Sequence, residues 1–231
     1  MEPTNTIKDL KKQPYNNSYK ENIKKYYNEE AESRDGKSTK VYWKVRVRNE
    51  FCELIKKEKK GNLLELGAGT GYDSLFFKET GINVTAIDIS QKMVKKCKEK
   101  LIEAYELDFY EVSSLKKTFD CIWAINTILH VPKSDLRHVL NEINSVLKHD
   151  GLLYIGLYGG KDTEEEFIKK EISEAPRFFS FHSEEYLKST LKDIFQILKF
   201  ESIEISNDTE TGVFYSITMR KRNILDKHDN L

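Results

Sequence analysis

The stretch that decides the fold is LLELGAGTGYD, residues 63–73. Apolar residues lead through Glu65 into a loop with glycine at every second position, and helix-compatible sequence follows. This order predicts a buried strand, a tight turn and a helix N-terminus, an arrangement that holds an adenosine-containing ligand at the carboxyl edge of a parallel sheet. Glycine allows a left-handed backbone in such a turn and leaves room for a ligand to approach.

The spacing of the glycines distinguishes this loop from two glycine-rich loops that bind phosphate groups. A dinucleotide fingerprint reads G-x-G-x-x-G, but Tyr72 stands where its third glycine should be. A P-loop ends in G-K-[ST], and no lysine follows Gly71. The sequence therefore disfavours both an NAD-dependent oxidoreductase and a P-loop enzyme.

Polar residues end three successive predicted strands. The strand after the loop ends at Asp88, about 20 residues on, where a carboxylate can bind ribose hydroxyls. Strands 104–107 and 119–125 end at Asp108 and Asn126. Asp and Asn also favour strand ends and caps for local reasons, but three in a row beside a glycine loop favour a binding site. Ser90 is expected to cap the helix 91–101.

The rest of the chain alternates strands and helices, which by itself indicates an α/β protein. Residues 1–20 are polar and predicted to be flexible, and residues 21–60 are predicted to form a helical segment with helices at 20–32 and 41–59. Residues 61–222 are expected to be the main domain with an insert at 159–183, followed by a polar tail at 223–231. Within the domain the patterns predict a helix at 135–148 capped by Ser134, a helix at 183–193, and a hairpin from strands 199–205 and 212–220.

Composition narrows the class of protein. The chain has 231 residues, and its 38 basic and 38 acidic side chains give a net charge of zero, which argues against a nucleic-acid partner. It contains no apolar run long enough for a membrane helix and no signal-peptide core near Met1. Three isolated cysteines at 52, 97 and 121 form no C-x-x-C pair, so we expect reduced thiols, a cytoplasmic protein and no metal site.

Together the segments LLELGAGTG, AIDIS, ELDF, FDCIWAINTILHV and LKHDGLLYIGLYG resemble the class I S-adenosylmethionine-dependent methyltransferases over residues 62–220. The resemblance implies a Rossmann-like three-layer α/β sandwich. Its sheet would have seven mostly parallel strands with a C-terminal antiparallel hairpin, and N-terminal helices would precede it. It also implies S-adenosylmethionine as cofactor, S-adenosylhomocysteine as product, and a helical lid or acceptor-binding role for residues 21–60.

The resemblance also assigns roles to individual residues. Gly67, Ala68 and Gly69 would lie under the methionine part of the cofactor, with Glu65 supporting its ammonium end. Asp88 would accept from the ribose hydroxyls. Around the adenine it places Ile89, Met93, Asp108 and Phe109. Met93 fits a plain core position equally well, and Glu65 a cap of the loop.

The segment after the fourth predicted strand bears on the methyl acceptor. Methyltransferases of planar amides often carry Asn/Asp-Pro-Pro-aromatic there, whereas this chain has Asn126 followed by Thr-Ile-Leu. Small-molecule members often have a histidine near His130, whose unperturbed pKa suits a general base. Asn126 and His130 are therefore the candidate catalytic residues, and a histidine bonded to the backbone is the competing interpretation of His130.

Aromatic and basic residues outside the motifs are candidates for the acceptor pocket. The predicted substrate-binding residues are Tyr27, Trp43, Arg46, Tyr158, Arg177, Phe181 and His182, with Tyr26, Arg34, Phe179 and Tyr186 as further members of the set. A packed satellite core fits the same aromatics. Arg46 and Arg177 suit an acceptor carboxylate but also fit plain surface charges, so we expect a carboxylate- or phenol-bearing acceptor.

The sequence leaves three functions open. The first is a methyltransferase acting on O or N of a small molecule. The second is a tRNA-modifying methyltransferase, which the zero net charge disfavours. The third is a cofactor-binding regulator without catalysis, although no motif position is visibly disrupted. The oligomeric state and the identity of the acceptor cannot be predicted from this sequence.

Overall fold

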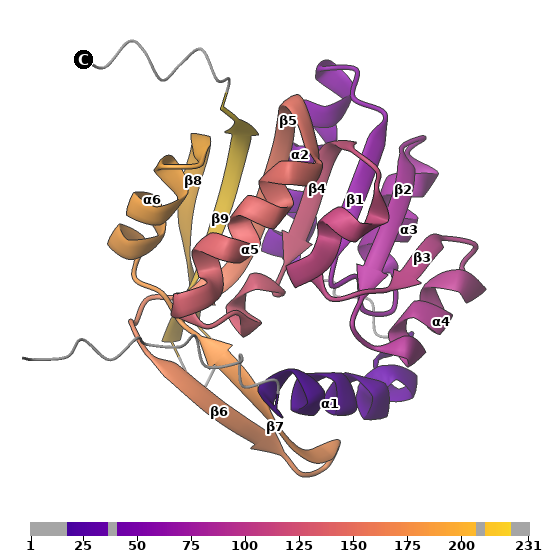
Figure 1. Ribbon diagram of the computed structural model, residues 1–231, viewed down its shortest axis with the longest axis vertical. Helices are drawn as coiled ribbons and strands as arrows, with labels where there is room; N and C mark the ends of the chain where they lie inside the picture. The colour runs from indigo at the N-terminus through magenta and orange to yellow at the C-terminus, as the bar shows by residue number, and fades with distance from the viewer. Residues whose placement is uncertain (1–17, 37–40, 207–210, 223–231) are drawn as a thin grey trace, which may run out of the picture.

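The computed structural model describes residues 18–36, 41–206 and 211–222 and has a seven-stranded sheet as its centre (Figure 1). The strand order is β3-β2-β1-β4-β5-β9-β8. The first five strands in this order are parallel to one another, and β9 is antiparallel to both of its neighbours. The strands are β1 (Asn62–Leu66), β2 (Asn83–Asp88), β3 (Glu103–Glu106), β4 (Phe119–Ile125), β5 (Leu147–Gly159), β8 (Phe195–Ser206) and β9 (Thr211–Lys221). The predicted fold class, including the reversed strand of the C-terminal hairpin, is confirmed.

Helices cover both faces of this sheet, which makes three layers. One face carries α2 (Tyr42–Lys57), α3 (Tyr72–Glu79) and α4 (Gln91–Glu99), and the other carries α5 (Lys133–Val146) and α6 (Glu184–Lys192). The strands between them are apolar in both directions, so that Leu63 packs towards α2 and Leu64 towards α5. Because both faces are buried, a continuous apolar run marks these strands instead of an alternating pattern.

Two elements lie across the carboxyl edge of the sheet: helix α1 (Ser18–Arg34) and a small sheet of β6 (Glu164–Lys169) and β7 (Ser173–Ser180) (Figure 1). They contact each other, with the ring centroids of Tyr19 and Phe178 5.4 Å apart. The sequence predicted an insert here but not its two strands, since β6 is mostly exposed and charged and does not alternate.

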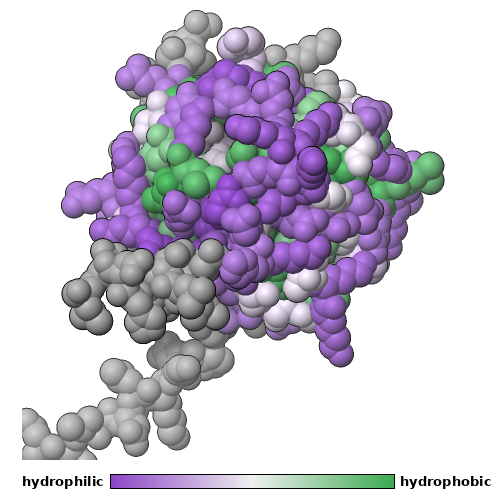
Figure 2. Space-filling model, turned by 90° about the horizontal axis from the view of Figure 1, so that it is seen from above, coloured by the Kyte–Doolittle hydropathy of each residue, from purple (hydrophilic) through white to green (hydrophobic). Residues whose placement is uncertain are grey.

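The amino edge of the sheet lies on the opposite side of the molecule. Seen from above Figure 1, the coloured surface is mostly hydrophilic, with scattered hydrophobic groups (Figure 2). None of the helices within the described ranges is long and apolar enough to cross a membrane. The features that could hold a ligand therefore gather at the carboxyl edge, beneath α1 and β7.

Local predictions had mixed outcomes. Ser90 caps α4 as predicted, because its hydroxyl accepts from the backbone N–H of Met93 at 3.2 Å. The predicted Ser134 cap is wrong: α5 begins at Lys133, and the Ser134 hydroxyl donates instead to the Asp135 carboxylate. Helix α1 begins at Ser18, inside the segment expected to be flexible, while residues 1–17 and the tail 223–231 lie outside the described residues.

Candidate active site

The glycine loop connects β1 to α3 and is fixed to the next strand by its backbone. Gly67 and Gly69 both have left-handed φ angles, +63° and +55°. The N–H of Ala68 donates to the carbonyl of Ile87 at 3.0 Å, and the N–H of Gly69 donates to the Asp88 carboxylate at 2.8 Å. The loop is therefore held at the end of β2 before any ligand binds.

Asp88 is buried at the carboxyl end of β2, with 7% of its surface exposed. Besides Gly69, the backbone N–H of Ser90 donates to it at 2.8 Å, so each carboxylate oxygen has one backbone donor. Burial raises the pKa of this carboxyl, although both hydrogen bonds oppose the shift. An ionised carboxylate offers about four acceptor positions, so Asp88 keeps acceptor capacity towards a ligand.

Glu65 and Asn126 lie at the ends of neighbouring strands β1 and β4. Glu65 accepts a hydrogen bond from the Ser74 hydroxyl, and burial together with the nearby Asp73 raises its pKa well above the usual value. Asn126 has a left-handed φ of +54°, and its buried side-chain oxygen has no hydrogen-bond partner within the described part of the chain. A buried acceptor without a donor is costly, which suggests that a ligand supplies the donor.

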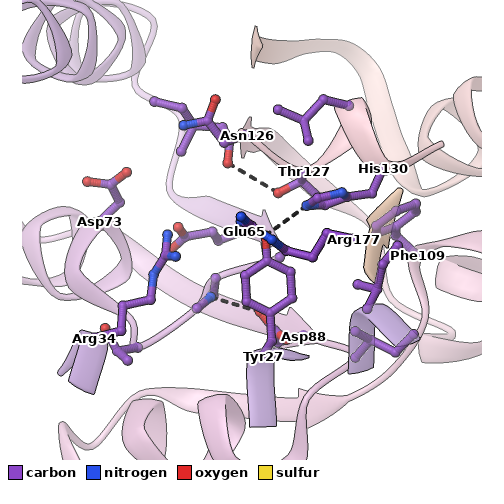
Figure 3. A pocket seen from close by; sticks show the side chains of 18 of the residues that line it. Tyr27, Arg34, Glu65, Asp73, Asp88, Phe109, Asn126, Thr127, His130 and Arg177 are labelled. Atoms are coloured by element: carbon purple, nitrogen blue, oxygen red, sulfur yellow. Dashed lines mark hydrogen bonds between the residues drawn. The ribbon is translucent and has the colours of Figure 1, made fainter. Parts of the chain in front are cut away.

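These residues surround a cavity of about 570 Å³. Its walls are the glycine loop, the ends of β2 and β4, α1, the start of α2, and β7 (Figure 3). The predicted site residues that line it are Tyr27, Arg34, Glu65, Gly67, Ala68, Gly69, Asp88, Ile89, Asp108, Phe109, Asn126, His130, Tyr158, Arg177 and Phe179. These predicted residues come from seven separate segments of the chain and converge on one cavity.

His130 faces the cavity with both ring nitrogens engaged. Its Nδ1 lies 2.7 Å from the carbonyl oxygen of Phe178, and its Nε2 lies 2.8 Å from the hydroxyl of Tyr27 (Figure 3). A carbonyl only accepts, so Nδ1 carries the proton and Nε2 accepts from Tyr27. Burial, with smaller contributions from Arg177 and Arg34, lowers the His130 pKa to about 4. The ring is therefore neutral near pH 7.

Asp108 differs from Asp88 in being partly exposed and already paired. Its carboxylate binds the ammonium of Lys20 at 2.8 Å and accepts from the N–H of Tyr110 at 3.0 Å. Lys20 also lies 3.2 Å from the centroid of the Tyr110 ring. Helix α1 therefore closes the cavity at the end where Asp108 and Phe109 stand.

Five predicted site residues lie elsewhere. Met93 is completely buried and does not line the cavity. Trp43 packs against Phe214, with centroids 4.2 Å apart, and Arg46 forms ion pairs with Glu50 and Glu201. Phe181 does not line the cavity but stacks on Phe179, which does, and His182 is buried against Tyr186. Trp43 and Arg46 find these partners on β9 and β8, which are distant from them in the sequence.

Other lining residues were not predicted. They are Tyr19, Lys20, Ile23, Lys44, Val45, Arg48, Thr70, Tyr72, Asp73, Tyr110, Ile125, Thr127 and Leu129. Lys44 and Arg48 are four residues apart and therefore share one face of α2. This spacing is the one signal in the sequence that could have placed them together at the site. Arg48 pairs with Asp73 at 2.8 Å, so this face of α2 is attached to the first turn of α3.

The burial of His182 leads to a prediction about stability and pH. Both of its nitrogens are buried without hydrogen-bond partners in the described chain, and burial lowers its pKa from 6.5 to about 4. Since the folded protein binds this proton less readily than the unfolded chain, stability falls as the pH drops below 6.5. The free energy of unfolding at pH 5, relative to pH 7, should fall by about 2 kcal/mol more in the wild type than in His182→Phe.

Urea titrations at both pH values measure this difference. The carboxylates that titrate in the same range are common to both proteins and cancel. Parallel pH dependences of the two proteins would contradict the assignment of the shifted proton to His182.

The fold and the site define a class of protein: a sheet with the order β3-β2-β1-β4-β5-β9-β8, with a glycine loop and an acidic strand end that together suit an adenosine-type ligand. Comparison with known proteins agrees. The family described as "Methyltransferase domain" matches residues 63–151. An uncharacterized methyltransferase of Alkaliphilus oremlandii is 27% identical over 212 residues, covering 85% of this chain and 88% of that protein.

Two further comparisons cover the chain differently. A malonyl-[acyl-carrier protein] O-methyltransferase of Hamiltonella defensa is 33% identical over 129 residues, which is 53% of this chain and about half (49%) of that protein. The crystal structure of 1,6-didemethyltoxoflavin-N1-methyltransferase from Burkholderia thailandensis superposes with a TM-score of 0.65 at 16% identity, covering 92% of this chain and 93% of that one. The family model and the structural similarity together support a class I S-adenosylmethionine-dependent methyltransferase, an enzyme that takes a methyl group from S-adenosylmethionine.

Proposed function

We propose that this methyltransferase acts on an oxygen or nitrogen atom of a small molecule. The observation that carries the proposal is the closure of the cavity by α1 and β7. The Arg177 guanidinium lies 4.1 Å from the centroid of the Tyr26 ring, which joins β7 to α1 directly. The cavity volume of about 570 Å³ lies within the range typical of small-ligand sites. A polymer would have to displace α1 or β7 to reach the same place.

The residues present fit S-adenosylmethionine. Asp88 has acceptor capacity for the ribose hydroxyls, and the unpartnered oxygen of Asn126, with Glu65, suits the ammonium group. At Gly69 a Cβ would meet only the Nε of Arg34, at 3.8 Å, so the loop leaves space for the methionine part. Ile89, Asp108 and Phe109 line the end of the cavity proposed for the adenine. When bound, the cofactor supplies a methyl group already activated on a sulfonium.

The chain's own contribution is then binding, orientation and exclusion of water. Helix α1 and strand β7 cover the reacting groups, and the Tyr27–His130–Phe178 chain of hydrogen bonds fixes the side chains beneath them. Holding an acceptor in line with the activated methyl can supply much of the rate without further chemistry. Relatives that use O and N acceptors are both represented among the matches, which supports either atom class.

Calorimetric titration of the full chain with S-adenosylmethionine and S-adenosylhomocysteine, with NAD as control, tests the cofactor. We expect micromolar binding of the two sulfur compounds and none of NAD. Labelled methyl transfer to small acids, phenols and amines, compared with transfer to bulk tRNA, then tests the acceptor. Transfer to tRNA alone, with salt-sensitive binding, would favour the RNA-modifying alternative. Cofactor binding without transfer to any acceptor would favour a regulator.

A further inference from the structure

Arg177 is a cavity cation without a carboxylate partner among the described residues. Its guanidinium lies between the rings of Tyr26 and Phe179, 4.1 Å and 5.1 Å from their centroids. Within residues 18–36, 41–206 and 211–222 it forms no ion pair, and its buried Nε has no hydrogen-bond partner. By contrast, Arg34 pairs with Glu30 at 2.9 Å. A guanidinium flanked by aromatic faces, with donors to spare, suits a planar carboxylate.

The position of Arg177 separates it from the other cations of the cavity. Arg34 lies by the glycine loop, and Lys44 is close enough to Arg34 and Asp73 for their charges to affect its pKa. These two suit the carboxylate that the cofactor itself carries. Arg177 extends from β7 to the side of the cavity where Tyr27 and His130 meet (Figure 3). It is therefore placed to bind the acceptor.

On the same side of the cavity, none of the lining residues that the structure describes is ready to take a proton. His130 Nε2 already accepts from Tyr27, and Nδ1 already donates to Phe178. With the His130 pKa at about 4, taking a proton from a phenol of pKa about 10 would be uphill by about 10⁶-fold. Burial raises the pKa of Tyr26 and of Tyr27, so both hydroxyls keep their protons. A phenol or an ammonium would have to lose its proton without help.

We infer that the acceptor is a small organic carboxylate bound by Arg177, and that the methyl group goes to a carboxylate oxygen. This inference rests on the proposed function. The carboxylate arrives ionised, so an O–CH₃ bond forms while the C–S bond breaks. The bonding pair stays on sulfur, which becomes a neutral thioether, and no proton is released. Arg177 would hold one carboxylate oxygen and leave the other free to attack, which is a binding and orienting role.

Binding of matched acids and amides tests the anion site without turnover. The full chain loaded with S-adenosylhomocysteine is titrated with benzoate and phenylacetate, and with benzamide and phenylacetamide. We expect the wild type to bind at least one acid about 10- to 100-fold more tightly than its amide, since a charged hydrogen bond is lost in the amide. R177Q should lose that preference, and R177K should keep part of it. Equal binding of acids and amides would overturn the inference, as would an unchanged preference in R177Q.

Arg137→Gln is the matched control, because Arg137 is exposed on α5, away from the cavity, and pairs with Asp193. It should leave the preference for acids unchanged, and R177Q should bind S-adenosylhomocysteine within about threefold of the wild type. The product settles the methylated atom: a carboxyl methyl ester releases labelled methanol in mild alkali. Alkali-stable products on phenols or amines would overturn the inference but leave the proposed function intact. Absence of cofactor binding would contradict the proposed function itself.

Discussion

Asp88→Asn is expected to weaken the binding of S-adenosylhomocysteine by about 10- to 100-fold, the effect of removing a charged hydrogen-bond acceptor from a buried site. The carboxylate is held by the N–H groups of Gly69 and Ser90, both at 2.8 Å, so it is already oriented in the free protein. Asparagine has one acceptor oxygen instead of two. Its NH₂ group would face one of these backbone donors, and the amide would compete poorly for ribose hydroxyls.

Because Asp88 also holds the glycine loop, the experiment must separate a contact with ribose from support of the loop. Calorimetry with S-adenosylhomocysteine and with its 2′,3′-dideoxy analogue makes this separation. If Asp88 binds the hydroxyls, Asp88→Asn should weaken the natural ligand strongly and the dideoxy analogue much less. Equal weakening of both ligands would show that Asp88 acts only through the loop.

Asp108→Asn provides the matched control for Asp88. The Asp108 side chain is 25% exposed and already forms an ion pair with Lys20. Solvent and the lysine therefore both reduce the binding free energy that a ligand gains from a hydrogen bond to Asp108. We expect a smaller loss of affinity for this variant, nearly the same for both ligands. The comparison also tests whether Asp108, at the end of β3, contributes strongly to binding of the ligand.

The sheet and the glycine loop could be predicted because their signals are local. Residues 63–66 form a buried strand with apolar neighbours on both faces, and Gly67 and Gly69 require a backbone that other residues rarely adopt. The position of Asp88 beside the loop could be predicted in the same way, since neighbouring parallel strands end at the same edge of the sheet. Ser134 failed as a cap because α5 begins at Lys133 with Pro132 in the N-cap position, so that Ser134 already lies inside the first turn.

The acceptor side of the cavity could be predicted only in part, since it depends on where distant segments dock. Arg177 and Arg46 look alike in the sequence, yet β7 carries Arg177 into the cavity while Glu201 of β8 holds Arg46 outside it. Trp43 is turned away by Phe214 of β9 in the same manner. Periodicity describes which face of an element is apolar, but not which element from elsewhere will cover it.

Gly67→Ala is expected to destabilise the protein by about 2–5 kcal/mol, the largest effect on stability among these predictions. Part of the loss, about 1–2 kcal/mol, comes from placing a Cβ at the left-handed φ of +63°. The rest, about 1–3 kcal/mol, comes from overpacking, since the new Cβ would stand 2.7 Å from Cγ2 of Thr127. Thr127 is buried, and its hydroxyl donates to the carbonyl of Leu66 at 2.9 Å, so it cannot turn away without losing that bond.

Gly81→Ala separates the two contributions. Gly81 also has a left-handed φ, +90°, but an added Cβ there would meet no atom within 4 Å. Urea unfolding of the ligand-free proteins should therefore show the backbone strain alone for Gly81→Ala and an additional 1–3 kcal/mol, roughly, for Gly67→Ala. Equal losses would mean that Thr127 gives way at no cost. In that case the glycine at 67 would be required by the backbone alone, and the contact between the loop and the end of β4 would not fix the loop's position.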